Sequence, residues 1–403
     1  MGCTAIHAVG RRKKKPSIPE VVVYVPSMRI PTQSDLQRSL KGLIPRDLVD
    51  RLACLRNQIS LVAEDTGGTA ITELTRALEE YLSILIGLTK KENVSRTVEF
   101  KWKSLEDGRH ENPVLNSWFE LLSVLHMMAI LTLSEADSLM IPKDHFVSGT
   151  RVVTSDCKRD AVDLLLKAAG YLEFCVREVL VRIPEDVKKR FSKDLQDGVL
   201  EAMSIQALGQ GTEVQLGLAV ESQKATLSVK RRLACEQLIY FGQAYHCLSG
   251  CEMNHENGKK HLRFIKWKFL EAKAAAYYYH GLILDKEACG NDLDSSIVIL
   301  ENFCVHNQFI FLARSPPLWG AMKHLHQKIP EVASKKSQMY GYLLEEEKAL
   351  QALPDLPDFQ LSLRPDEYAL PEMDEAWDRE RWQLQKQSLK ENLRDSEDEI
   401  ETE

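Results

Sequence analysis

Five side chains that can bind a metal ion gather in one short stretch of the sequence. The stretch contains His246, Cys247, Cys251, His255 and His261. A Cys-x3-Cys spacing followed by two histidines offers nitrogen and sulfur ligands of the kind that zinc prefers. However, Cys247 ends a predicted helix, and the sequence has no second clustered pair that would complete such a site. We therefore interpret these side chains as helix-end and loop residues, and we predict neither a metal nor another cofactor.

Other residues with chemical potential also lack partners at a recognisable spacing. Gly209-Gln210-Gly211 neither follows a strand nor opens a phosphate-binding loop. Glu120 and Glu213 stand inside apolar helical segments, where they could be buried acids, but no base or nucleophile accompanies them. An all-α enzyme of prenyl-diphosphate type would need paired Asp-rich motifs, and Asn291-Asp292-Leu293-Asp294 is too sparse to supply them. We predict that the protein is not an enzyme, and an active site of unknown type stays an alternative.

The first fifteen residues, MGCTAIHAVGRRKKK, differ from the rest of the chain. Removal of Met1 would expose Gly2 to N-myristoylation, and Cys3 could carry a palmitoyl chain. Five consecutive cations follow, namely Arg11, Arg12, Lys13, Lys14 and Lys15. One acyl chain binds a membrane only weakly, whereas a second chain or a basic patch makes the attachment lasting. We predict a lipidated, membrane-bound leader; a disordered basic leader with a chance Gly2 is the alternative.

The composition indicates a large globular protein of a reducing compartment. The chain has 403 residues, 44% hydrophobic content and nine cysteines, and it begins with no secretory signal sequence, which favours reduced thiols. The net charge of -7 gives no sign of nucleic-acid binding, because such proteins usually carry a basic excess. The longest nearly apolar run, residues 121–133, is too short for a membrane span. We expect a cytoplasmic protein that lies peripherally on an endosomal or plasma membrane.

Helical periodicity dominates the sequence after residue 46. Phe264–Lys286 carries apolar stripes on two sides, with small residues at Ala274–Ala276 and Gly281, which predicts a central helix with neighbours on both sides. Two segments are predicted as strands, Val21–Ile30 and Thr97–Lys103. Small residues at the expected helix crossings favour an irregular tetratricopeptide-like solenoid, and a plain helical bundle is the alternative. The other predicted helices are Asp47–Val62, Ile71–Leu88, Trp118–Asp137, Lys158–Ile183, Leu195–Glu221, Thr226–Leu248, Ser295–Ala313 and Met339–Leu353.

The C-terminal part divides into an extended strap and an acidic tail. Leu353–Pro371 contains four prolines, so it cannot be helical throughout. We expect it to pack on the helices through Leu356, Phe359, Leu361 and Leu363. Residues 372–403 contain twelve acidic and five basic residues and are predicted to be a solvated tail, with a possible helix over Asp374–Leu393. The predicted organisation is a leader over residues 1–19, one domain over 20–371 and the tail over 372–403.

Six segments, taken in order, resemble one protein family. They are VEFKW, SWFELLSVLHMMAILTLSEA, KRDAVDLLLKAAGYLEF, ALGQGTEVQLGLA with the following RRLACEQLIYFGQAY, KFLEAKAAAYYYHGLILDK, and LPDLPDF. In order and spacing they resemble the BRO domain of the Alix and BROX proteins over roughly residues 20–370. The resemblance implies a mainly α, boomerang-shaped helical solenoid with a small β element near its start. It also implies an adaptor that binds the C-terminal amphipathic helix of the core ESCRT-III filament subunit at endosomal membranes.

The sequence departs from the two named proteins in ways that bear on membrane attachment. It shows neither the coiled-coil arm and proline-rich tail of Alix nor the C-terminal prenylation cysteine of BROX. We expect the Gly2-Cys3 start to replace that lipid from the other end of the chain. A single-domain BRO protein that begins Met-Gly-Cys is most similar to the plant members of the family.

The expected partner groove lies between two antiparallel helices that meet near Ser222. The core stripe of the second helix is predicted to be Ala234, Leu238, Phe241, Tyr245 and Leu248. Val229 and Leu233 lie four residues apart outside that stripe, beside the cations Lys230, Arg231 and Arg232. An apolar strip with a basic margin suits an amphipathic helix whose polar side is acidic.

The resemblance implies the same groove. It puts Val229 and Leu233 at two of the family's filament-contacting positions, and Leu216 on the preceding helix is expected to line the groove with them. Strict alignment of the third family position falls on Gln215, one residue earlier. Two alternatives stay open: ordinary core packing of these residues, and a lipid-anchored helical scaffold that binds a different peptide.

Overall fold

A computed structural model describes most of the chain. It covers residues 19–105, 113–144, 151–287 and 355–377, together with scattered helical residues between 324 and 338. The predicted helices Ser295–Ala313 and Met339–Leu353 lie outside the described residues, as does most of the helix expected over Asp374–Leu393, of which the structure gives the short helical turn η4, Glu375–Trp377.

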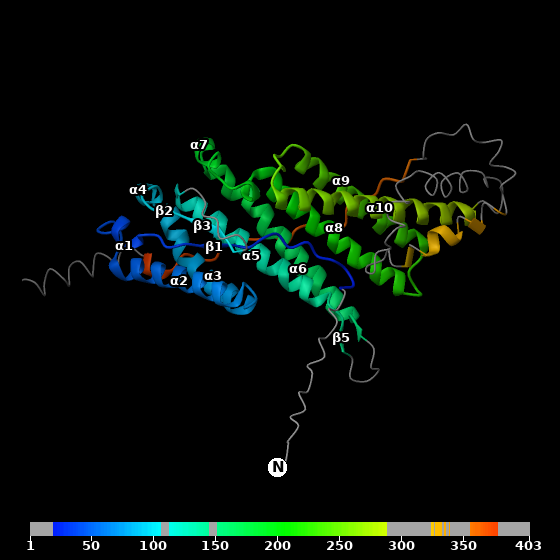
Figure 1. The fold of residues 1–403 in the computed structure, drawn as a ribbon, viewed down its shortest axis with the longest axis horizontal. Helices are drawn as coiled ribbons and strands as arrows, with labels where there is room; N and C mark the ends of the chain where they lie inside the picture. The colour runs from blue at the N-terminus through cyan, green and yellow to red at the C-terminus, as the bar shows by residue number, and fades with distance from the viewer. Residues whose placement is uncertain are drawn as a thin grey trace, which may run out of the picture.

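Within the described ranges, seven long helices form an elongated row in which each packs against the next (Figure 1). In the order of packing they are α2 (Arg46–Thr66), α3 (Ile71–Thr89), α5 (Ser117–Leu139), α6 (Ser155–Phe174), α8 (Asp197–Glu221), α9 (Leu227–Ser249) and α10 (Glu256–Glu287). Shorter turns join them, namely α1 (Leu36–Ser39), α4 (Glu92–Ser95), α7 (Glu185–Lys188) and η3 (Lys193–Leu195). The predicted mainly α, solenoid-like array is confirmed.

The central position belongs to α5 rather than to the predicted Phe264–Lys286 helix. Among the described residues α5 is the one helix long and apolar enough to cross a membrane, but 89% of its most apolar window is buried inside the protein, as in a core helix. The predicted Phe264–Lys286 helix is part of α10, which packs on α9. Leu325 and Ile329 join the same buried cluster as the alanines of α10, so α10 packs against α9 on one side and against the segment of Leu325 and Ile329 as well.

A side-chain cap sets where α5 begins. Asn116 Oδ1 accepts from the backbone N–H groups of Trp118 and Phe119 at the start of α5, which satisfies two of the amide groups that a helix start leaves unpaired.

The predicted Lys158–Ile183 helix is α-helical only to Phe174 and continues as a π turn, η1 (Cys175–Val179), and a 3-10 turn, η2 (Leu180–Arg182).

The small β element is built from short pairs, and the predicted strand Thr97–Lys103 is confirmed as two short strands, β2 (Glu99–Phe100) and β3 (Trp102–Ser104). β1 (Arg29–Pro31) pairs antiparallel with β3, and β2 pairs with β4 (Val114–Leu115). A third pair joins β5 (Lys143–Asp144) to β6 (Arg151–Val152). The prediction of a strand over Val21–Ile30 is wrong for most of its length, because Glu20 and Val23 donate their N–H groups to the C-terminal end of α5 instead of to a ladder.

A buried ion pair fixes this β element to the helices. Glu120 on α5 is fully buried and accepts hydrogen bonds from Arg56 Nε at 2.8 Å, Tyr81 Oη at 2.9 Å and Trp102 Nε1 at 2.7 Å. The Arg56 guanidinium also donates to the carbonyls of Thr32 and Lys101. The predicted buried acid at Glu120 is confirmed, and its role is structural, since three donors, one of them a guanidinium, satisfy its charge.

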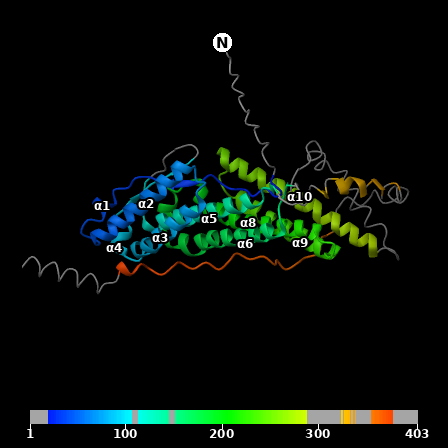
Figure 2. The ribbon, with the colours of Figure 1, turned by 90° about the horizontal axis from the view of Figure 1, so that it is seen from below.

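The strap runs back along one face of the row (Figure 2). Residues 355–374 are extended, and along much of this stretch inward-facing side chains alternate with exposed ones, as the period of two in extended chains requires. The predicted contacts of Leu356, Phe359, Leu361 and Leu363 with the buried clusters are confirmed. Gly170 lets the strap approach α6 closely, because a side-chain carbon there would overlap the carbonyl oxygen of Asp366.

Candidate functional site

The first turns of α9 present the apolar residues expected to bind a partner. Thr226 caps the helix, with its hydroxyl accepting from the N–H of Val229 at 3.3 Å. Val229 is 45% exposed, which is unusual for a large apolar side chain in this protein. Leu233, one turn later, is half-buried and packs against a cluster built by α8, α9 and α10. The two predicted residues therefore lie at the surface and at its edge, and not in the core.

Leu216 does not line this surface. Its side chain is 1% exposed and lies in the same buried cluster as Ala234 and Ala275. The expectation that it faces a partner is therefore wrong for this conformation, because α9 and α10 cover it. The alternative of ordinary core packing holds for Leu216.

The core stripe of α9 is correct at most positions. Ala234, Phe241 and Leu248 are buried, and Leu238 is half-buried. Tyr245 is 40% exposed, so the stripe is narrower than the sequence suggests. Its neighbours Ala244 and Leu248 are buried, so the exposure is confined to the Tyr245 side chain.

Two of the three cations beside Val229 and Leu233 contact other residues of the protein. Arg231 Nη1 lies 3.2 Å from His280 Nδ1 on α10, and its guanidinium lies 5.8 Å from the centre of the Phe359 ring. Arg232 Nε donates to Glu236 Oε1 at 2.8 Å, and its Nη2 lies 3.4 Å from the carbonyl oxygen of Gln360. These two cations therefore hold the strap, although the sequence predicted them to face a partner.

Glu236 is a residue of this surface that the sequence did not predict. It is fully buried on α9 and accepts from the backbone N–H of Ser362 at 3.0 Å as well as from the Ser362 hydroxyl. Tyr240, one turn later, donates its hydroxyl to the carbonyl of Leu363 at 2.6 Å. A lone acid within the apolar segment 234–240, four residues after Arg232, was the available signal. Strap residues 360–363 therefore lie along α9 from Arg232 to Tyr240.

The first described residues of the chain lie beside the connection between α8 and α9. Lys158 Nζ is 2.5 Å from Glu20 Oε1 and 2.6 Å from Glu221 Oε1. Because Glu221 ends α8, the chain enters the domain next to the α8–α9 connection. The predicted lipidation residues Gly2 and Cys3 and the cations Arg11 to Lys15 lie outside the described residues.

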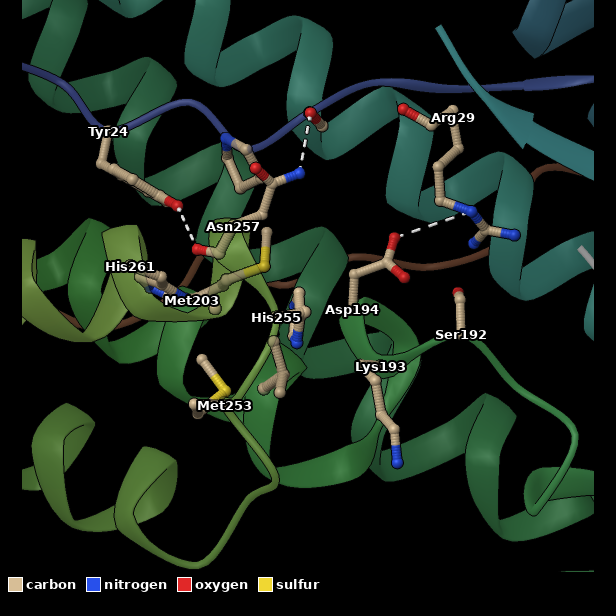
Figure 3. Close-up of a pocket in the computed structure, with 15 residues that line it drawn as sticks. Tyr24, Arg29, Ser192, Lys193, Asp194, Met203, Met253, His255, Asn257 and His261 are labelled. Carbon is tan, nitrogen blue, oxygen red and sulfur yellow. Dashed lines mark hydrogen bonds and ion pairs between the residues drawn. The ribbon is translucent and has the colours of Figure 1, made fainter. Parts of the chain in front are cut away.

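The five side chains considered above as metal ligands do not come together in one site. His255 and His261 line a cavity of about 250 Å³ between the N-terminal segment, η3 and the start of α10 (Figure 3). His261 stacks on Tyr24 with ring centres 4.7 Å apart and shares a 2.7 Å hydrogen bond with Gln206, and burial lowers its pKa to about 4. Cys251 donates instead to the carbonyl of Cys247. Within the described residues no three His, Cys, Asp or Glu side chains converge as metal ligands.

Comparisons with known proteins identify the family and the fold of this chain. The model of the BRO1-like domain matches residues 45–302. The chain belongs to the BRO1-like domain family. A search of curated proteins found no match.

Solved structures with the same fold include two Bro1 domains. The structure described as "Structure basis for endosomal targeting by the Bro1 domain" is similar with a TM-score of 0.59 and 13% identity, covering 89% of this chain and 95% of that one. The "ALIX BRO1 CHMP4C complex" has a TM-score of 0.59 and 14% identity, covering 88% and 95%. ALIX bound to the SIVmac239 PYKEVTEDL late domain has a TM-score of 0.61 and 15% identity, covering 87% of this chain and 50% of that one. At these identities the likeness shows the fold.

A second buried charge cluster lies inside this BRO1-like domain, between α8 and α10. Lys268 is fully buried and lies 2.8 Å from Glu213 Oε1 and 3.2 Å from Glu271 Oε2. Its Nζ also lies 4.4 Å from the centre of the Trp267 ring. The predicted buried acid at Glu213 is confirmed, and its partner is a lysine from another helix. One lysine faces two carboxyl groups, so a proton can be held in place of the second negative charge.

This cluster predicts a pH-dependent stability. Burial, opposed by Lys268 and reinforced by Glu213, raises the pKa of Glu271 from 4.5 to about 7. Between these pH values the folded protein holds a proton that the unfolded chain has released, so the free energy of unfolding falls as the pH rises from about 4.5 to about 7. At about 1.4 kcal/mol for each pKa unit, the loss amounts to a few kcal/mol.

The measurement is urea unfolding of wild type and Glu271→Gln across this pH range. The Glu271→Gln variant keeps a hydrogen-bonding side chain of the same size without the titration, so its stability is expected to vary less between pH 5 and pH 8. The exposed Glu135→Gln on α5 is the matched control and should follow the wild type. Parallel curves for wild type and Glu271→Gln would contradict the assignment.

Proposed function

We propose that this BRO1-like domain protein is a membrane-attached adaptor that binds the C-terminal amphipathic helix of the core ESCRT-III filament subunit. It would act in endosomal sorting or in membrane remodelling. Family membership and a shared fold with a BRO1 domain in complex with CHMP4C support this proposal. The observation that carries it is the exposure of Val229 beside half-buried Leu233 on the first turns of α9.

The chemistry of this surface suits an amphipathic helix. An apolar helix face binds in a groove through residues spaced three or four apart, and Val229 and Leu233 give it one such strip. Lys230 lies beside them, and the Arg232 side chain is 49% exposed even while it is paired with Glu236. An acidic polar face of the partner would meet these cations at the rim of the groove, where charge mainly steers association.

We further propose that Gly2 and Cys3 carry acyl chains and that Arg11 to Lys15 bind acidic lipid headgroups. The ion pairs of Lys158 with Glu20 and Glu221 support a leader that leaves the domain beside the α8–α9 connection. An anchor at that point would hold the α9 groove near a membrane on which filaments assemble. The location that follows is the cytoplasmic face of an endosomal or plasma membrane.

Substituting Val229→Asp tests the groove. Val229 is the third residue of α9, where a carboxylate favours the helix start, so the fold should be unaffected. Burying the charge against an apolar partner should weaken binding about tenfold or more. The measurement is the affinity of the full chain for a peptide of the ESCRT-III core subunit's C-terminal helix, by calorimetry or anisotropy.

The matched control for this substitution is Val181→Asp. Val181 is 69% exposed on η2, far along the row from α9, and its replacement should leave the affinity unchanged. If wild type binds the peptide and Val229→Asp binds it equally well, the groove lies elsewhere. If no form binds, the fold serves a different peptide, and the adaptor proposal is overturned.

Substituting Gly2→Ala tests the anchor, because N-myristoylation needs an N-terminal glycine. The variant is expected to move from the membrane pellet to the supernatant when cell lysates are fractionated. Neutralising Arg11 to Lys15 should weaken attachment less, by an amount that shrinks at high salt. Continued sedimentation of Gly2→Ala with membranes would exclude the lipid anchor, whatever the peptide measurement shows.

A further inference from the structure

A second concave surface lies at the other end of the row from the α9 groove. It is a pocket of about 840 Å³ between the end of α3, α4, the start of α5 and the π turn η1. Trp118, Phe174 and the strap residue Leu370 form apolar parts of its wall. A π turn in place of regular helix is often found at functional sites. The pocket is thus formed by four helical segments and by the strap.

The charged residues of this pocket are mostly cations. Lys90, Arg96 and Arg182 line it, and Glu178 is the one acid in the described lining. The Arg182 guanidinium lies 5.0 Å from the centre of the Trp118 ring and 3.6 Å from Glu178. Lys90 and Arg96 are exposed and form no ion pair within the described part of the chain. The pocket therefore offers aromatic surface with an excess of positive charge, which suits an acidic peptide.

The strap delivers the C-terminal tail to the edge of this pocket. Trp377, the last described residue, is 3% exposed and donates its Nε1–H to the carbonyl of Ile84 at 3.0 Å. Its ring packs against Gly87 and lies 4.9 Å from Lys91 Nζ. Lys90, the neighbour of Lys91, lines the pocket. The chain that follows residue 377 therefore begins beside the pocket wall.

The remaining sequence has the complementary charge and enough length. Residues 395–403, DSEDEIETE, hold six acidic residues, no basic residue and the apolar Ile400. The 17 residues between 377 and 395 reach about 25 Å even as the helix expected over Asp374–Leu393, at about 1.5 Å per residue. Tethering at that distance raises the effective concentration of the segment to the millimolar range, at which weak ionic contacts become occupied.

We propose that the acidic segment 395–403 of this same chain binds the pocket lined by Lys90, Arg96 and Trp118. Its carboxylates pair with the cations, and Ile400 covers the aromatic wall. Because Leu370 of the strap is part of that wall, the bound tail holds the end of the strap in place. The proposal is independent of the ESCRT-III function, since α3 and α4, which line the pocket, and the first turns of α9 lie toward opposite ends of the helix row (Figure 1).

Zero-length carbodiimide cross-linking of the full chain, read by mass spectrometry, tests this inference. The reagent joins amines to carboxylates that are in contact, so low salt should give links from Lys90 to the carboxylates of residues 395–403. The yield should fall steeply in 1 M salt, where the screening length is about 3 Å. A mixture of light and isotope-labelled protein should show that the link forms within one chain.

Substituting Arg96→Glu keeps the reporting lysine and reverses a neighbouring charge, which should lower the link yield about fivefold or more. Arg96 is exposed, and a thermal melt checks that the fold is retained. Lys224→Glu on the exposed α8–α9 connection is the matched control and should leave the yield unchanged. Links spread over other lysines, links between chains, or a yield that neither salt nor Arg96→Glu changes would each overturn the proposal.

Discussion

The buried pair of Arg56 and Glu120 is the constraint on which the N-terminal half of the molecule depends. Both side chains are nearly or fully buried, and together they contact α2, α3, α5, β3 and the chain before α1. An isolated buried charge costs several kcal/mol, whereas a paired and fully hydrogen-bonded one is tolerated. Because Trp102 on β3 is one of the donors to Glu120, the β1–β3 pair docks on the helices in the register that brings its indole N–H to this carboxylate.

The strap plays a comparable part along the rest of the row. An array of helices leaves one face of each helix uncovered, and an extended chain with alternating side chains covers such a face with few residues. Glu236, Tyr240 and the carbonyl of Leu166 hold the strap at intervals, and Trp377 closes it at α3. Arg231 and Arg232 also contact the strap, at Phe359 and Gln360, so the surface around Val229 and Leu233 lies beside it. Any partner at Val229 therefore binds next to a segment from the C-terminal part of the domain.

Periodicity predicted the long helices of the described residues, most of their ends and the inward side of the strap, because these features follow from local patterns of apolar residues. It could not predict which side of an apolar stripe meets solvent. Leu216 and Tyr245 show both errors: one is covered by α10, which comes much later in the sequence, and the other is exposed although its neighbours Ala244 and Leu248 are buried. Likewise the roles of Arg231 and Glu236 depend on contacts with residues 359–362, more than a hundred positions away. Such long-range pairings leave no periodic signal.

The binding of a partner helix at the first turns of α9 can be mapped in solution. Hydrogen–deuterium exchange of the full chain, with and without a peptide of the ESCRT-III core subunit's C-terminal helix, maps where a partner lies. We predict added protection over the end of α8 and the first turns of α9, with the strap at residues 356–363 equally protected in both states because it lies beside the groove. Protection confined to other helices, or none at saturating peptide, would contradict the α9 groove as the partner site.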